Sequence, residues 1–492
     1  VEKGDVASGT SSRSSKLVHG GLRYLKQGQI KVTRQSSRER DRMLAGNPEL
    51  VRPMPFLYPV RRQDGLPGWM IDAGLTVYDL LSTGPSHRTV SEEEARALAP
   101  GVDLTGLDRA LVYGDAWVDD ARLTLAIAAT AYERGGLLLT RAEVLEGIES
   151  AGGRIAGAKV RDLETGRVHS FPARVVVNAA GVWVDEVRHR LGLEGRRIRP
   201  SRGSHLVLPA GRLPLAAAVT VPSPDDRRPV FLLPFPEGVL IGTTDLYHDG
   251  PLDEPRPSAD EAAYLLRAAR SLFPDAGLSA RDVVGAFAGL RPILGSLSEH
   301  GASPSSASRA EDVWEERGLL SAAGGKLTTW RITAQEAVDA AIGLLPDERA
   351  RAALPSISTV TPLAGWAPTD LPRRLTALAP IPAGVAEAMA RRLRGAAPWA
   401  LSLARDEGEL MPLSDGTDLC AAEVRAHLAA GAVVRLEDLL LRRVRLGTWR
   451  PEAARALVPA LAPLFAQELG WDEGRWEREE EAFEQALGGA GT

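Results

Sequence analysis

The sequence predicts an α/β fold that includes a mixed sheet and ends in an all-helical domain. Strand and helix patterns alternate through the first half of the 492-residue chain. Between Gly203 and Gly242, short apolar runs flank the turn Pro236-Glu237-Gly238, which is the pattern of an antiparallel sheet. From about Leu345 prolines mark a linker, and beyond it Ala, Leu, Arg and Glu recur with helical periodicity. With 44% hydrophobic and 25% charged residues, the chain is expected to form two or three globular domains.

Periodicity and turn residues place the elements of the first half. Three helices are predicted, at residues 29–45, 69–82 and 120–134, the last begun by Asp119-Asp120 and ended by Gly135-Gly136. A buried strand is predicted at 137–140, and further strands at 154–160 and 168–177. The last strand runs into small residues at 178–181, which allow close approach of a ligand to the backbone.

The first 24 residues, VEKGDVASGTSSRSSKLVHGGLRY, have the pattern of the middle of a nucleotide-binding unit. In such a unit a strand leads into a Gly-rich turn and helix, and the second strand ends on an acid that binds a ribose hydroxyl. Glu2 stands where that acid is expected. The loop after it combines small hydroxyl residues and glycines with spaced cations, which suits a phosphorylated ligand. The Gly-x-Gly-x-x-Gly turn that should come first is missing, so we expect that the given sequence starts late.

Composition excludes several classes of function. The 59 basic and 64 acidic side chains are near balance, so no nucleic-acid partner is indicated. Cys420 is the single cysteine, which excludes a disulfide framework and favours a reducing compartment, and no metal-ligand spacing is present. No run reaches the roughly 18 apolar residues of a membrane span, so any membrane contact is expected to be peripheral. Residues 11–42 are locally basic, and a solvated helix face explains residues 31–42, whereas ligand binding is favoured for Arg13, Lys16 and Arg23.

Six segments, in one order along the chain, resemble FAD-dependent glycerol-3-phosphate dehydrogenase. They are residues 1–24, VNAAGVWVD (177–185), RGSHLVLP (202–209), IGTTD (241–245), AGLRPIL (288–294) and GGKLTTWR (324–331). A weaker match, LEDLLLRRVRLGTW (436–449), resembles the helical end of the family. The resemblance implies a two-dinucleotide-domain flavoprotein of the D-amino-acid-oxidase type. Without the Gly-rich turn, this form is expected to bind FAD poorly.

The resemblance also implies a division of the chain. A discontinuous cofactor and substrate domain covers residues 1–350, with FAD binding at about 1–45, 116–200 and 284–345 and a substrate sheet at about 46–115 and 201–283. A helical domain covers 351–492. Positions that match the family's FAD contacts are Glu2, Thr10, Ser11, Ser12, Ser15, Lys16, Leu17, His19, Gly20, Gly21, Val144, Ala179, Ala180, Gly181, Trp183, Gly324, Gly325, Lys326, Leu327 and Thr328.

Oxidation of a secondary alcohol needs a base, a hydride acceptor and, for this substrate, a clamp for a phosphate dianion. The family's anion-binding positions fall on Arg23, Arg291 and Arg309, with Tyr24 and Thr328 as uncharged donors. His205 can act as a base because an unperturbed imidazole has a pKa near ~6.5. Lys326 can stabilise a developing alkoxide and is the second candidate. The structural alternatives are a packing role for His205 or His19, a strand-ending charge for Arg291 and an ordinary turn at Gly324-Gly325.

By resemblance the chain yields dihydroxyacetone phosphate and passes electrons to a membrane quinone from the cytoplasmic face of the inner membrane. A homodimer is compatible with the sequence. Two alternatives stay open: an amine or amino-acid oxidase on the same fold, and a non-catalytic binding protein. Delivery of electrons to oxygen instead of a quinone also stays open.

Overall fold

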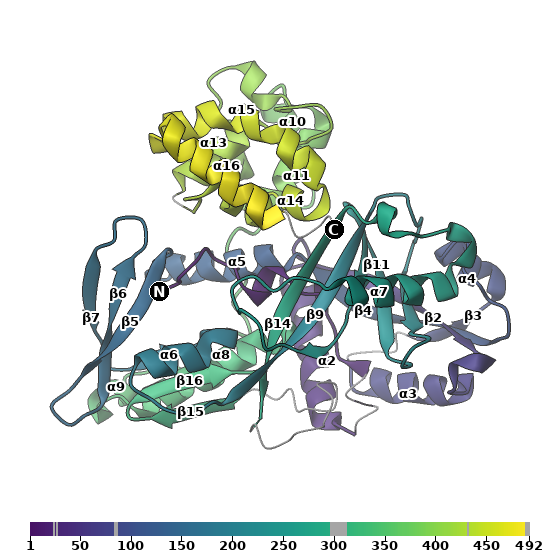
Figure 1. The fold of residues 1–492 in the computed structure, drawn as a ribbon, viewed down its shortest axis with the longest axis horizontal. Coiled ribbons are helices and arrows are strands. Elements are labelled where there is room, and N and C mark those ends of the chain that lie inside the picture. Colours follow the sequence, from purple (N-terminus) through teal and green to yellow (C-terminus); the bar gives the residue numbers. More distant parts are fainter. Residues whose placement is uncertain (23–24, 26–27, 83–86, 296–311, 431, 488–492) are drawn as a thin grey trace.

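The computed structural model describes residues 1–492 apart from 23–24, 26–27, 83–86, 296–311, 431 and 488–492. Figure 1 shows a large sheet with its helices on the right, smaller sheets on the left and a helical domain above both. The N-terminus lies beside β5, at the left.

The largest sheet has ten strands within the described residues. Their order is β1-β4-β2-β10-β11-β12-β9-β13, with β3 paired to β4 and β14 paired to β9. The strands are β1 (Leu17–Val18), β2 (Val51–Arg61), β3 (Arg88–Val90), β4 (Leu107–Val118), β9 (Ile198–Pro209), β10 (Ala218–Pro222), β11 (Pro229–Phe235), β12 (Gly238–Gly242), β13 (Leu246–Tyr247) and β14 (Gly285–Leu294).

The centre of this sheet is buried on both faces. Every residue of β10 and β12 is buried, which explains their nearly continuous apolar sequences, AVTVP and GVLIG. Helix α7 (Ala259–Leu272) begins at a capping box between Ser258 and Glu261 and packs its apolar face on the sheet. Helices α3 (Gly68–Leu80) and α4 (Glu92–Leu98) complete this part of the molecule.

The smaller sheets contain one pair of parallel strands. In the described sheets, the only other parallel pair is β2 with β10. Strand β8 (Val176–Asn178) runs parallel to β16 (Leu319–Ala323), which also pairs with β15 (Asp312–Glu316). A separate antiparallel sheet consists of β5 (Ala142–Glu149), β6 (Ile155–Asp162) and β7 (Val168–Pro172). Helices α6 (Val184–Arg190) and α8 (Trp330–Gly343) pack on these smaller sheets, whereas α2 (Ile30–Gly46) and α5 (Asp120–Glu133) pack against strands of the large sheet.

The three predicted helices and the 231–242 hairpin are confirmed, but two strand predictions are wrong. Leu137 to Leu139 form no strand, and the Leu137 side chain is 88% exposed, because a buried strand needs cover on both faces. The predicted strand 168–177 is two strands in two sheets. Pro172 ends β7, since proline has no N–H to continue the ladder, and β8 starts at Val176.

Strand β14 belongs to the large sheet, although the sequence placed residues 284–295 with the cofactor-binding part. It pairs with β9 over its whole length, from Gly285 opposite Val207 to Leu294 opposite Ile198. This pairing brings Arg291 and His205 onto neighbouring strands.

The C-terminal part is helical, as expected. Short helix α9 (Asp347–Arg351) lies within the predicted linker, and a π-helical turn, η9 (Asp438–Arg443), lies within the domain. The other helices are α10 (Leu371–Leu378), α11 (Ala383–Leu393), α12 (Ala397–Leu401), α13 (Ala421–Ala429), α14 (Leu446–Trp449), α15 (Pro451–Leu469) and α16 (Glu473–Leu487).

Trp449 joins this helical domain to the large sheet. Its side chain is buried in the same apolar cluster as Phe235 of β11, with ring centroids 5.2 Å apart. The two parts therefore share a core and are not merely tethered by the linker.

Replacing Trp449 with Ala should lower the free energy of unfolding by about 3–5 kcal/mol, because the truncation leaves a cavity between helical domain and sheet. Urea unfolding followed by circular dichroism measures the loss. The control, Trp366→Ala, removes an exposed indole and should cost less than about 0.5 kcal/mol. Equal, small losses in both variants would show that Trp449 does not join the two parts.

Candidate active site

The loop from Thr10 to Gly21 is where four separate segments of the chain meet. The Thr10 hydroxyl donates to the Leu290 carbonyl at 2.6 Å, next to Arg291 on β14. Ser15 Oγ lies 2.8 Å from His205 Nε2 on β9. A side-chain carbon added at Gly9 would lie 3.0 Å from the Trp183 ring, so the glycine permits this close approach.

The far end of the loop contacts the Gly324–Thr328 turn. The Thr328 hydroxyl accepts from the His19 amide at 3.2 Å and lies 3.3 Å from the His19 carbonyl. Gly324 and Gly325 both have left-handed backbone angles, φ 84° and 77°, which explains why glycines precede the lysine. Lys326 Nζ donates to Ser36 Oγ of α2 at 3.3 Å. Leu327 packs with the cluster beneath β1.

His205 is buried and stacks on Phe287 of β14, with ring centroids 4.9 Å apart and planes 20° from parallel. Burial lowers the pKa of His205 well below its usual 6.5, and the positive charges of Arg291 and Lys16 lower it further. The imidazole is therefore neutral at neutral pH, as a proton acceptor must be.

Arg291 lies beside His205 and is held by three oxygens. It donates to Thr243 Oγ1 at 3.1 Å and to the Thr244 carbonyl at 3.4 Å, and it pairs with Asp245 at 3.3 Å. A side-chain carbon at Gly203 would lie 2.2 Å from Nη2, so this glycine leaves room for the guanidinium. Its side chain is 24% exposed, and a ligand can therefore reach it.

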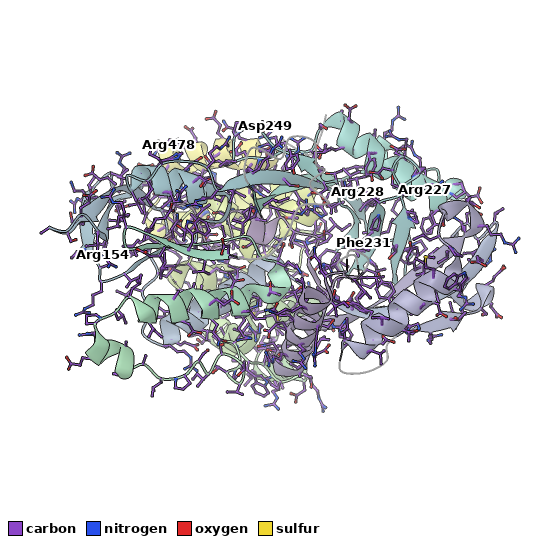
Figure 2. The ribbon with its side chains drawn as sticks, turned by 90° about the horizontal axis from the view of Figure 1, so that it is seen from below. Arg154, Arg227, Arg228, Phe231, Asp249 and Arg478 are labelled. Carbon is purple, nitrogen blue, oxygen red and sulfur yellow. The ribbon has the colours of Figure 1, made fainter. Side chains whose placement is uncertain are left out.

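Asp245 is shared by two arginines. Arg228, which directly precedes β11 and is labelled in Figure 2, pairs with it at 3.3 Å. Because the carboxylate is buried, it fixes the direction of Arg291 while offsetting part of its charge.

The turn after β8 has the openness that a cofactor contact requires. Asn178 Nδ2 donates to the Val184 carbonyl at 2.9 Å, and its Oδ1 accepts from the Ala180 amide at 3.2 Å. Ala179 is exposed, and nothing lies within 4 Å of a carbon added at Gly181. Trp183 Nε1 is buried without a hydrogen-bond partner among the described residues, so a polar ligand group fits there.

Four other predicted contact residues also make contacts within the protein. Lys16 is buried in an ion pair with Asp120 at 2.9 Å, and Leu17, in strand β1, is buried in an apolar cluster of the large sheet. The Val144 carbonyl accepts from Arg190 at 2.6 Å, while its side chain joins a small apolar cluster. One Glu2 carboxylate oxygen accepts from the Gly4 amide at 2.8 Å.

Three of the predicted substrate residues, Arg23, Tyr24 and Arg309, lie outside the described residues. The remaining loop residues, Ser11, Ser12, Gly20 and Gly21, lie on the same segment as Thr10 and Ser15. Gly20 packs so closely that an added carbon would lie 2.3 Å from Ser37 Oγ.

Sequence reasoning missed two residues of the site, Phe287 and the buried acid Asp120. The sequence predicts that Asp119 and Asp120 both cap the helix, but Asp119 alone accepts the capping bond from the Arg122 amide. The sequence signal for a further role of Asp120 is that a second acid stands beside Asp119, which is sufficient as the cap. Phe287 carried none, because an aromatic residue in a strand is ordinary.

Comparison with known proteins agrees with this geometry. Residues 1–365 match the family described as FAD dependent oxidoreductase, and residues 356–476 match the C-terminal domain of alpha-glycerophosphate oxidase. The fold is therefore that of the FAD-dependent oxidoreductases, as the sequence predicted, with a curled mixed sheet and a helical C-terminal domain.

Individual relatives indicate which kind of FAD-dependent oxidoreductase this chain resembles. Glycerol-3-phosphate dehydrogenase of Mycobacterium leprae is 34% identical over an alignment of 496 positions that covers 97% of this chain and 82% of that protein. The aerobic enzyme of Staphylococcus haemolyticus is 36% identical over 69% of this chain, and the match spans 61% of that protein. The glycerol-3-phosphate dehydrogenase of Bacillus halodurans, solved with FAD, superimposes with a TM-score of 0.78 at 26% identity, covering 99% of this chain and 89% of that chain. The chain belongs to the glycerol-3-phosphate dehydrogenase family.

The neutral state of His205 can be measured directly. Its imidazole resonances should not titrate between about pH 6 and 8, and Arg291→Gln should raise its pKa because a nearby positive charge is lost. Nuclear magnetic resonance of 13C-labelled histidine follows both changes. Arg228→Gln is the control, since it removes the other arginine at Asp245 and should leave His205 unaltered. Titration of His205 near ~6.5 in the native protein would contradict the assignment.

Proposed function

We propose that the protein oxidises sn-glycerol 3-phosphate to dihydroxyacetone phosphate, with the FAD of its family as the cofactor. The observation that carries the proposal is a neutral, buried histidine beside a reachable, fixed arginine, at the loop where the cofactor-contact positions converge. The names of the family relatives support the substrate.

The described residues fit the cofactor at several points. Glu2 would hold the ribose, the Thr10–Gly21 loop and the Gly324–Thr328 turn would enclose the flavin side, and the Asn178–Trp183 turn would add a second contact. When bound, the flavin supplies the hydride acceptor.

The protein's own groups supply the rest of the reaction. His205 Nε2, the nitrogen that faces the loop, is the proposed acceptor of the substrate's hydroxyl proton. Arg291 is the proposed phosphate ligand, with Arg23 and Arg309 as further ligands and Tyr24 as a donor. Lys326 is proposed to stabilise the developing alkoxide, and Thr328 to hold His19 in place.

We also propose that a quinone in the bilayer accepts the electrons and that the protein docks on the cytoplasmic face of the inner membrane. Helix α3 supports this proposal. Trp69, Met70, Val77 and Leu80 are exposed and fall within about 100° of the helix circumference. Among the described helices, none is long and apolar enough to cross a bilayer.

The phosphate clamp is tested by Arg291→Ala. Loss of a charge-assisted partner worth roughly 1.5 to 3 kcal/mol should lower kcat/KM for glycerol 3-phosphate about 10- to 150-fold, while bound flavin is retained. Steady-state assays with an artificial acceptor give the value, and dihydroxyacetone phosphate is measured as product. Arg212→Ala is the matched control, because its side chain is similarly exposed at 28% but pairs with Asp282 outside the site, and it should change kcat/KM less than about 3-fold. Unchanged kinetics in Arg291→Ala would remove it from the substrate site.

Membrane docking is tested by Leu80→Glu, which places a charge on the apolar face of α3. The variant should lose most of its sedimentation with phospholipid vesicles and its rate with a vesicle-bound quinone, yet keep its rate with a water-soluble acceptor. Leu378→Glu, at a leucine of α10 that is 67% exposed against 79% for Leu80, is the control. Vesicle binding that both variants keep would exclude α3 as the contact, and efficient turnover with oxygen alone would favour an oxidase.

A further inference from the structure

The helical domain reaches the loop of the candidate active site through the arginines at and after the π-helical turn. Arg442 and Arg443 of this turn pair with the buried Asp5 at 2.5 and 2.8 Å. Two residues further on, Arg445 pairs with Asp120 at 3.1 Å and donates to the Ser12 carbonyl at 3.0 Å. Residues more than 430 positions apart are thus joined by buried charge-assisted bonds.

Asp120 connects Arg445 to the residue beside Ser15. Oδ1 of Asp120 accepts from Lys16 Nζ at 2.9 Å and also from Arg445. Oδ2 accepts from the Ser14 amide at 3.0 Å and from the Ser14 hydroxyl at 2.7 Å. The carboxylate is wholly buried, so it is stabilised only by these partners and by the helix that it begins.

Two of these cationic residues have a left-handed backbone conformation, which residues other than glycine rarely adopt. Arg445 has φ 64° and Lys16 has φ 59°, and both side chains are buried. Such a conformation is strained and persists where surrounding contacts fix it. The charged groups of both strained residues are directed at the same carboxylate. Their contacts therefore define a specific geometry and are not merely an attraction between opposite charges.

We propose that Arg445 is a positioning residue, by which the helical domain holds residues 12–16 so that Ser15 faces His205. The path is short: Arg445 fixes the Ser12 carbonyl and Asp120, Asp120 fixes Ser14, and the next residue, Ser15, bonds to His205 at 2.8 Å. The role in catalysis rests on the proposed function, in which His205 is the base.

The domain's attachment does not depend on Arg445 alone. Trp449 buries its ring against the sheet, and Arg442 and Arg443 bind Asp5. Removal of Arg445 should therefore loosen the loop while the helical domain stays in place.

The test compares Arg445→Met with Arg425→Met. Arg425 is also a buried arginine of the helical domain, but it pairs with Glu409 at 2.8 Å and with Glu468, both within that domain. Hydrogen exchange in the chain without substrate should rise at least about 10-fold for amides of residues 12–16 in Arg445→Met and less than about 2-fold in Arg425→Met. This readout does not depend on activity.

Kinetics of the flavin-loaded protein give the second readout. Arg445→Met should lower the rate of flavin reduction by glycerol 3-phosphate at least about 10-fold with a change in KM below about 3-fold, and it should shift the pH profile of that rate. Arg445→Lys, which keeps the charge, should recover part of the rate and serves as the test variant if the methionine form does not fold.

The outcomes distinguish the positioning role of Arg445 from the proposed function. Faster loop exchange in Arg445→Met with no reduction by glycerol 3-phosphate in the native protein would uphold the positioning role and reject the proposed function. Equal exchange in Arg445→Met and Arg425→Met, or normal reduction rates in Arg445→Met with a loosened loop, would overturn the positioning role.

Discussion

The buried carboxylate of Asp120 is the contact on which the arrangement of the site depends. Removing a charge from water costs several kcal/mol, so a carboxylate with no exposed surface persists only with close cationic and hydrogen-bonding partners. Here the partners come from the loop and from the helical domain, through Lys16 and Arg445. The need to satisfy one acid therefore draws together segments that are hundreds of residues apart in sequence.

A second buried acid holds the same loop near its C-terminal end. Asp115, near the end of β4, accepts from the Gly20 amide at 3.3 Å, from Arg40 at 2.7 Å and from Tyr78 at 2.8 Å. The Thr10–Gly21 loop is thus fixed in its middle by Asp120 and near its C-terminal end by Asp115. A loop preorganised in this way loses less entropy when a ligand binds, which suits a site that must hold substrate and cofactor in register.

The features that could be predicted from the sequence are those that depend on local residue patterns or on the order of motifs along the chain. Helices α2, α3 and α5 follow from periodicity and caps, and the fold class follows from the six family segments. The exposed run at Leu137 and the break at Pro172 were not predictable in this way, because burial and strand partners are decided by tertiary neighbours. Lys16 shows the same limit within the site. A lysine among serines and glycines indicates an anionic ligand, but the structure gives it an internal anion, Asp120, which lies 104 positions away.

The central claim, that Asp120 sets the environment of His205 through the loop and Ser15, is tested most directly by a double-mutant cycle between Asp120→Asn and Ser15→Ala. The measured quantity is the pKa of His205 from histidine resonances in the native protein, the two single variants and the double variant. If Asp120 acts through Ser15, Asp120→Asn changes this pKa when Ser15 is present and adds little once Ser15 is alanine. Fully additive effects of the two substitutions would contradict the account, because Asp120 would then act on His205 by a route that does not include Ser15.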